Sequence, residues 1–112
     1  MKQKDVISVE TYDEVLDRYN KTEYVVLSRD EYNLAVKQVL VCRVIYVTDM
    51  KPYFIPIRIP GLRRNSKVNT LNISTLEFAN YLKVKSESIG EISNREFLEI
   101  AQAVSLNFKF PI

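Results

Sequence analysis

The side chains available for chemistry in this chain are limited by two counts, because it has no histidine and only one cysteine. Without histidine, neither a Ser-His-Asp nor a Cys-His nucleophilic system can form, and one thiol cannot build a Cys/His zinc site. Carboxylates, hydroxyls, tyrosines and basic side chains remain as candidates. We expect no Cys/His metal site and no cofactor. Because Cys42 lies in the apolar run Val39–Cys42, we expect it to be a small core residue of a protein from a reducing compartment.

The clearest charged feature is a basic stretch in the middle of the chain. No acidic residue occurs from Met50 to Leu76. The same stretch contains five basic residues: Lys51, Arg58, Arg63, Arg64 and Lys67. Such a cluster predicts a surface for a polyanion, for example the phosphate backbone of a nucleic acid. An ordinary solvated rim of a sheet is the alternative interpretation.

Hydrophobic patterning predicts that short strands position these residues. Lys37–Val47 is apolar after its first two residues except for Arg43, which is typical of a central strand covered on both faces. The strand Tyr53–Ile59 is expected at an edge or with a bulge, because Pro56 cannot donate to a strand ladder. Residues 10–22, rich in charge and tyrosine, are predicted to form a long loop with at most one helical turn. Further strands are predicted at Asp5–Val9, Glu23–Leu27, Lys67–Ile73 and Leu82–Lys85.

Three Ser-x-x-Glu spacings predict helix starts, because this pair can satisfy free N–H groups of a first helical turn. They begin at Ser28, Ser74 and Ser93, and the first two helices are expected to end near Val36 and Tyr81. Gly90 is expected to break the chain before the third helix. That final helix has an amphipathic pattern. Its apolar face is predicted to contain Phe97, Ile100, Ala101, Val104 and Phe108.

These elements predict the fold class and the domain organisation. A chain of 112 residues has the usual size of one domain, so residues 1–112 are expected to form a single unit. We expect a mainly β protein: a small, strongly curved antiparallel sheet or barrel, with short helices and a C-terminal amphipathic helix packed against it. The polar N-terminus and the short apolar runs favour a soluble, cytoplasmic protein without a membrane partner.

Several local strings occur in an informative order. Of these, the segment YVVLSRDEYN over Tyr24–Asn33 is the most specific. The others are Lys4–Val9, Val39–Val47, Pro52–Ile57, Pro60–Leu62, Leu71–Leu76 and Ile89–Phe97. In this order and spacing, over nearly the whole chain, they resemble the MazF/PemK toxins of bacterial type II toxin–antitoxin systems, whose fold is a small SH3-like barrel with a C-terminal helix.

The resemblance implies a function. It implies a cytoplasmic homodimer that cuts single-stranded RNA without a metal ion and that binds a cognate antitoxin protein. In the family, the cut uses an arginine after the first loop and a threonine or serine at the end of the third strand. This sequence has Thr22-Glu23 in place of the family's Arg-Pro, and Arg43–Thr48 in place of its Ser/Thr motif.

Other residues are therefore expected to supply these groups. The candidates for the cation are Arg18, Lys21 and Arg43, and we favour Arg43 because a strand would hold it rigidly. Tyr46 or Thr48 is expected to supply the hydroxyl. The alternatives are an ion pair for Arg43, a half-buried strand aromatic for Tyr46, and plain solvation for the two loop cations.

The end of the chain leaves a second function open. CcdB-like toxins of the same superfamily poison DNA gyrase through an apolar C-terminal tail, and Leu106–Ile112 is loosely similar to that ending. The alternative function is thus a non-nuclease relative, either a gyrase poison or a catalytically silent protein that binds an antitoxin or nucleic acid. If the tail is structural instead, Phe108 and Phe110 close the core.

Overall fold

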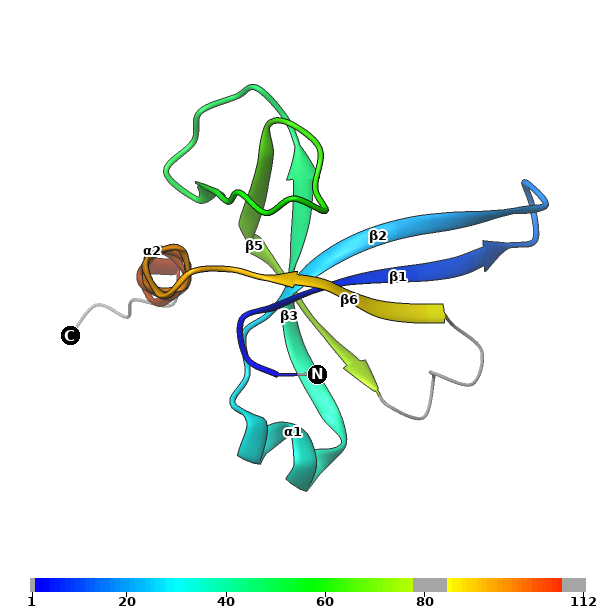
Figure 1. Ribbon diagram of the computed structural model, residues 1–112, viewed down its shortest axis with the longest axis horizontal. Coiled ribbons are helices and arrows are strands. Elements are labelled where there is room, and N and C mark those ends of the chain that lie inside the picture. The colour runs from blue at the N-terminus through cyan, green and yellow to red at the C-terminus, as the bar shows by residue number, and fades with distance from the viewer. Residues whose placement is uncertain (1, 78–84, 108–112) are drawn as a thin grey trace.

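The computed structural model describes residues 2–77 and 85–107 and shows an antiparallel sheet with two helices (Figure 1). The strand order is β4-β5-β3-β2-β1-β6, so β4 and β6 are the two edges and hydrogen bonds do not close the sheet. The predicted fold class, a mainly β protein with a curved sheet and a C-terminal helix, is confirmed. The elements are β1 (Asp5–Asp13), β2 (Arg18–Val26), α1 (Asp30–Val36), β3 (Gln38–Tyr46), β4 (Phe54–Pro56), β5 (Ser66–Glu77), β6 (Lys85–Glu91) and α2 (Asn94–Asn107).

Two strand predictions are confirmed by the strand order. β3 lies between β5 and β2, which makes it an interior strand of the sheet as its apolar sequence predicted. Pro56 lies in β4 at an edge, where its missing N–H leaves no gap in a two-sided ladder, but the strand spans only Phe54–Pro56 and not the predicted Tyr53–Ile59. The central strand is thus available to hold side chains rigidly on both faces.

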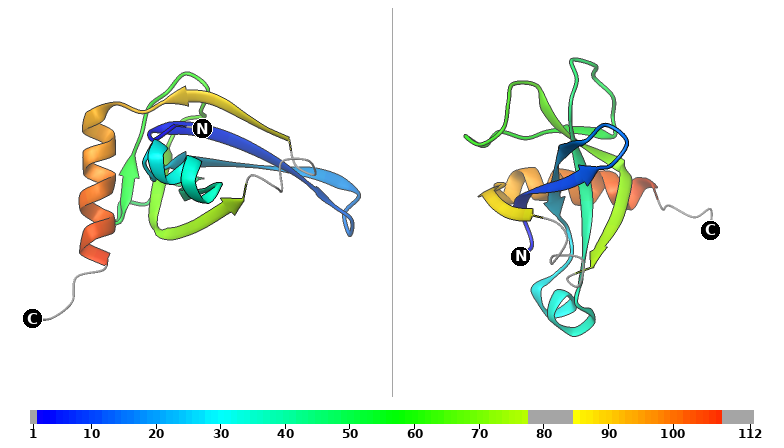
Figure 2. Two further views of the ribbon diagram at one scale, coloured as in Figure 1. Left: turned by 90° about the horizontal axis from the view of Figure 1, so that it is seen from below. Right: turned by 90° about the vertical axis from the view of Figure 1, so that its right-hand side faces the viewer.

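The prediction of a loop over residues 10–22 is wrong. These residues continue β1 and β2 into a hairpin that extends away from the rest of the sheet, paired from Val6↔Val25 to Asp13↔Arg18 (Figures 1 and 2). Its outer part carries polar and aromatic side chains because solvent reaches both faces there, so the apolar alternation that marks a strand is missing. Asp13 Oδ1 accepts from the N–H groups of Val15 and Leu16 at 2.9 and 3.2 Å and shapes the turn.

The predicted helix start at Ser74 is also wrong. Residues 74–77 extend β5, with Ser74 opposite Val41 and Leu76 opposite Val39 on β3. Leu76 packs on buried valines of β3, and this tertiary contact outweighs the local capping signal. The remainder of that predicted helix, to Tyr81, and residues 82–84 of the strand predicted at Leu82–Lys85 lie outside the described residues.

The two other Ser-x-x-Glu spacings have different outcomes. At Ser93 the capping box is confirmed, because Glu96 N–H donates to Ser93 Oγ at 3.1 Å and Ser93 N–H donates to Glu96 Oε1 at 2.9 Å. At Ser28 it is wrong: α1 forms, but its N-cap is Arg29, without a side-chain cap. The buried Ser28 hydroxyl instead donates to Asn33 Oδ1 and accepts from Leu40 N–H, so it joins α1 to β3.

The core consists of two clusters on opposite faces of the sheet. The larger one contains Val25, Cys42 and Val44 and is covered by α2, whose Ile100 is fully buried. The smaller one contains Val39 and Val41 with residues of β1 and β2. The prediction of Cys42 as a core residue is confirmed. On α2, Ile100 and Ala103 are the buried residues. Ala101 is half-buried, and Phe108 lies outside the described residues.

The loop after β4 crosses to β6 and partly completes a barrel. A Cβ at Gly61 would lie 3.1 Å from the carbonyl oxygen of Ile89, and one at Gly90 would lie 2.9 Å from Ile59 Cδ1. Both glycines thus allow a close approach between this loop and β6. Gly90 was predicted to break the chain, but it lies inside β6 near a register shift with β1.

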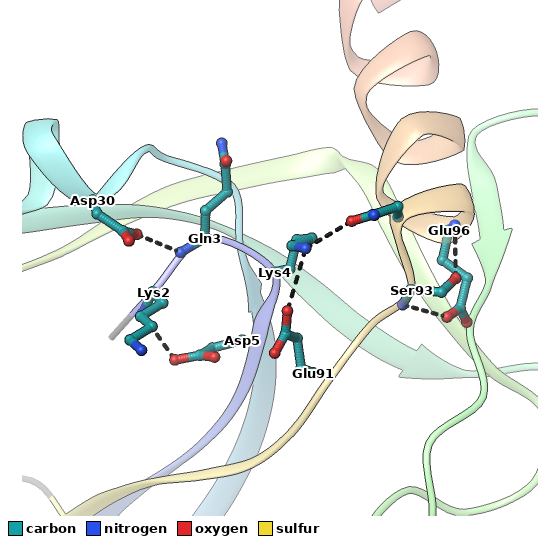
Figure 3. A network of polar contacts seen from close by, with 9 residues as sticks. Lys2, Gln3, Lys4, Asp5, Asp30, Glu91, Ser93 and Glu96 are labelled. Carbon is teal, nitrogen blue, oxygen red and sulfur yellow. Dashed lines mark hydrogen bonds and ion pairs between the residues drawn. The ribbon is translucent and has the colours of Figure 1, made fainter.

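The first residues of the chain connect three elements (Figure 3). Gln3 N–H donates to Asp30 Oδ1 of α1 at 2.9 Å. The Lys4 ammonium contacts Glu91 of β6 at 3.3 Å and donates to Asn94 Oδ1 of α2 at 2.7 Å. These contacts link α1 and α2 to the ends of β1 and β6.

Candidate nucleic-acid interface

β2 and β3 pair over only three residues and then diverge. The last pair is Tyr24↔Arg43, and beyond it the hairpin and β3 run in different directions (Figure 1). We call the divergence beyond Tyr24 and Arg43 the β2–β3 fork. Because side chains alternate along a strand, residues at the fork lie on two opposite faces of the sheet.

One face of the fork presents Arg43. Its chain neighbours Cys42 and Val44 are buried in the larger core, so Arg43 lies on the other face, where it is exposed. Its guanidinium has no hydrogen bond or ion pair with any residue that the structure describes. Thr22 of β2 lies two residues beyond Tyr24, on the same face, and is half-buried. This face therefore carries a free cation on a rigid strand.

The opposite face presents Tyr46, at the end of β3. Its ring packs against the larger core, and its hydroxyl donates to Glu23 Oε1 of β2 at 3.1 Å. The guanidinium carbon of Arg63 lies 4.0 Å from the ring centroid. Partial burial, followed by the Glu23 carboxylate, raises the pKa of Tyr46, and Arg63 opposes the shift. Tyr46 therefore stays a neutral hydrogen-bond donor at neutral pH.

Three exposed cations of the predicted basic stretch line one groove. The groove has a volume of about 590 Å³ and follows the loop between β4 and β5 and the start of β5. Arg58, Arg63 and Arg64 are exposed in its lining. Arg58 also donates its backbone N–H to Glu96 of α2 at 2.7 Å, which anchors this part of the loop. Three guanidiniums on one concave surface can contact successive phosphates.

The other two cations of the stretch are placed differently. Lys67 lines the groove, but it is only 6% exposed and its ammonium donates to the carbonyl oxygen of Val47. Its charge is thus engaged in holding the segment after β3. Lys51 is exposed and lies outside the lining of the groove.

The remaining candidates are dispersed. Arg18 and Lys21 lie in β2 instead of a loop, and both are exposed. Arg18 lies opposite Asp13 in the strand register near the tip of the hairpin. Thr48 is exposed just beyond β3. The structure thus brings Tyr46 together with Arg63, and it separates both from Arg43, since Tyr46 and Arg43 are on opposite faces of β3.

One residue of this surface was missed by sequence reasoning. Glu23 has an unremarkable position in a strand, and its contact with Tyr46 depends on the register of β2 and β3. The available signal was its alternation with the apolar Val25, which places both side chains on one face.

No helix among the described residues is long and apolar enough to cross a membrane. The described residues also contain no group of three or more Cys, Asp or Glu side chains arranged to hold a metal ion.

Comparisons with known proteins identify the fold. No family model and no curated protein matches the sequence. Among solved structures, MazF of Deinococcus radiodurans from a MazE–MazF crystal is similar with a TM-score of 0.78 and 13% identity, over 96% of this chain and 94% of that chain. The toxin MazF-mt6 of Mycobacterium tuberculosis has a TM-score of 0.70 and 17% identity, over 95% and 98%. A mycobacterial endoribonuclease in complex with its cognate antitoxin has a TM-score of 0.67 and 20% identity, over 93% and 95%.

The class defined by these observations is a small protein with a curved, open antiparallel sheet and a C-terminal helix. Within that class, the chain has the fold of the MazF toxins, which its sequence resemblance implied. The likeness covers almost the full length of each chain.

Proposed function

We propose that this chain is a toxin of a type II toxin–antitoxin system that cuts single-stranded RNA without a metal ion. The observation that carries the proposal is Arg43, an exposed cation without a partner among the described residues, held on an interior strand beside the β2–β3 fork. The MazF fold, shared with a mycobacterial endoribonuclease, supports the same activity.

The proposed reaction depends on charge stabilisation. The ribose 2′-hydroxyl loses its proton as its oxygen attacks the adjacent phosphorus, the bond to the 5′-oxygen of the next nucleotide breaks, and that oxygen takes up a proton. The products therefore end in a 2′,3′-cyclic phosphate and a 5′-hydroxyl. Negative charge develops on the phosphate oxygens during this step. A guanidinium that is already positioned stabilises that charge without reorganising. Arg43 on β3 meets this requirement better than Arg18 or Lys21 on the protruding hairpin (Figure 2).

Arg43 would replace the arginine that the MazF resemblance places at Thr22. Both residues lie on the same face of the sheet, Thr22 on β2 and Arg43 on β3, next to the fork. The charge would then reach the phosphate from the neighbouring strand.

The groove loop would bind the rest of the RNA backbone. Arg58, Arg63 and Arg64 are exposed cations along one groove, so they would contribute salt-dependent, sequence-independent affinity. Lys67 would contribute little to this contact, because its ammonium is buried against a carbonyl oxygen.

The proposed partners follow from the same fold. MazF of Deinococcus radiodurans occurs with MazE, and the mycobacterial endoribonuclease occurs with its cognate antitoxin. We propose that this chain forms a homodimer in the cytoplasm and binds an antitoxin whose acidic and apolar segments lie along the basic groove. The gyrase-poison alternative depends on residues 108–112, which lie outside the described residues, and no described contact favours it.

The proposal can be tested with purified full-length protein and a mixed-sequence RNA in excess EDTA. We expect a discrete set of fragments whose 3′ ends carry 2′,3′-cyclic phosphate by mass spectrometry. RNA that stays intact, or cutting that EDTA abolishes, would contradict the proposed activity. A protein prepared identically with Arg43→Ala controls for a contaminating ribonuclease, because a contaminant would be unaffected by the substitution.

A further inference from the structure

We propose that Tyr46, Glu23 and Arg63 form a subsite for one unpaired base of the RNA, and that this subsite selects guanine. The inference rests on the proposed function, and it names the part of the substrate that the face of the fork opposite Arg43 would recognise. Three observations support it: the restrained ring of Tyr46, the free oxygen of Glu23, and the double role of Arg63.

The ring of Tyr46 is held rigidly and supports the Arg63 guanidinium, whose outer face is the surface offered to a base. It is fixed on one side by the larger core and at its tip by the hydrogen bond to Glu23. The guanidinium carbon of Arg63 lies over the ring, 4.0 Å from its centroid. Unpaired bases in RNA complexes stack on aromatic rings and on guanidinium planes, so this stack offers a base a planar site that is already ordered.

The carboxylate of Glu23 would determine which base is accepted. Tyr46 occupies Oε1, and Oε2 has no partner among the residues that the structure describes. A carboxylate is an acceptor only, so it favours a base edge with adjacent donors. Guanine presents N1–H beside N2–H₂. Adenine and cytosine place a nitrogen acceptor beside their amino group, and uracil flanks its N3–H with two carbonyl oxygens, which a carboxylate repels.

Arg63 connects the subsite to the phosphate groove. The same side chain stacks on Tyr46 and lines the groove that contains Arg58 and Arg64. A nucleotide whose base rests on the stack would therefore have its phosphates close to the two other arginines. The stack, the positive groove and the Glu23 carboxylate would thus together bind a single strand of unpaired RNA.

The test uses four fluorescein-labelled decanucleotides of 2′-fluoro RNA, which lack the 2′-hydroxyl and therefore cannot be cut by the proposed reaction. One contains only uridine, and the others carry a single guanosine, adenosine or cytidine at the centre. Fluorescence anisotropy with the full chain gives four dissociation constants. We expect the guanosine oligonucleotide to bind roughly tenfold more tightly than the uridine one, the size of one good paired hydrogen-bond contact to a base.

Three variants separate the contributions. Glu23→Gln keeps the size of the side chain but replaces one acceptor by a donor, so the preference for guanosine should disappear while binding to the uridine oligonucleotide persists. Tyr46→Ala should weaken binding of all four about tenfold, since a stacked base contributes on that order. If Tyr46→Ala does not fold by circular dichroism, Tyr46→Phe keeps the ring and removes only the contact to Glu23, and it should reduce the guanosine preference.

Glu31→Gln and Tyr32→Ala on α1 are the matched controls and should leave all four dissociation constants unchanged.

The outcomes distinguish this inference from the proposed function. Equal affinity for the four oligonucleotides, or a guanosine preference that survives Glu23→Gln, would overturn the subsite and leave RNA binding intact. No binding of any oligonucleotide by the unaltered protein would overturn both.

Discussion

The two faces of the β2–β3 fork differ in how they hold a cation. On one face Arg43 comes from a rigid strand, is exposed and has no partner among the described residues. On the other, Arg63 comes from a loop and is held by the ring of Tyr46, whose hydroxyl is in turn held by Glu23. A free, rigid cation suits transition-state stabilisation, whereas a stacked cation beside a carboxylate suits recognition of a planar ligand.

Neighbours in a strand can thus have unrelated roles. Cys42 is fully buried and Arg43 is exposed, although they are adjacent on β3. Burial raises the pKa of the Cys42 thiol from 9.0 to about 12, so this residue acts as a core hydrophobe and not as a nucleophile. The face on which a side chain lies decides its chemistry more than its position along the chain.

The largest effect is expected when the same charge is placed on each face. Cys42→Asp should destabilise the fold by at least roughly 5 kcal/mol, because it buries a carboxylate with no partner. Arg43→Asp should cost about 1 kcal/mol, which is the range of strand propensity at an exposed site. Urea unfolding followed by circular dichroism measures both. Similar losses for the two variants would show that the faces are not distinct in burial.

A somewhat smaller effect is expected at alkaline pH. The folded-state pKa of Cys42 is raised to about 12, so the unfolded chain releases the thiol proton first as the pH rises from about 9. The stabilisation present below pH 9 should therefore be lost between about pH 9 and 12, by up to about 4 kcal/mol from this residue. The difference in unfolding free energy between the unaltered protein and Cys42→Val measures it. A difference that is constant over this pH range would argue against a buried thiol.

The smallest expected effect concerns the groove. The logarithm of RNA affinity should fall by about 0.7 units per phosphate contact for each tenfold rise in salt. Replacing Arg63 and Arg64 by alanine should therefore reduce the magnitude of that slope by about 1.4. Filter binding at four salt concentrations gives the slope. The double variant Arg29→Ala with Arg95→Ala removes two exposed arginines elsewhere and should leave the slope unchanged. An unchanged slope in the groove variant would show that the groove does not contact the RNA backbone.

Much of the scaffold of the fork could be predicted from sequence. The apolar run of β3 predicted an interior strand, and a spacing of three residues already places Arg43 and Tyr46 on opposite faces. The Ser93 capping box and the edge position of Pro56 were predicted for local physical reasons that the fold retains. These features depend on a few consecutive residues, so they can be predicted from the sequence.

The features that escaped prediction depend on contacts between distant segments. The hairpin of β1 and β2 lacks apolar alternation in its outer half, so it was interpreted as a loop. Ser28 was interpreted as a cap, but Leu40, 12 residues further along the chain, donates to its hydroxyl. Glu23 reaches Tyr46 through strand register, and Lys67 loses its availability to RNA through a bond to Val47. None of these partners can be inferred from spacing along the chain.

The role of Arg43 in cutting RNA is tested most directly by the single-turnover rate at saturating protein, for the unaltered chain, Arg43→Ala and Arg63→Ala. Arg43→Ala should lower this rate on the order of 10²- to 10³-fold, because it removes a main charge contact in the transition state. Arg63→Ala should change the protein concentration needed for saturation and leave the rate itself within a few-fold. Arg29→Ala is the matched control. A full rate in folded Arg43→Ala would contradict the assignment of the cutting site to this face of the fork.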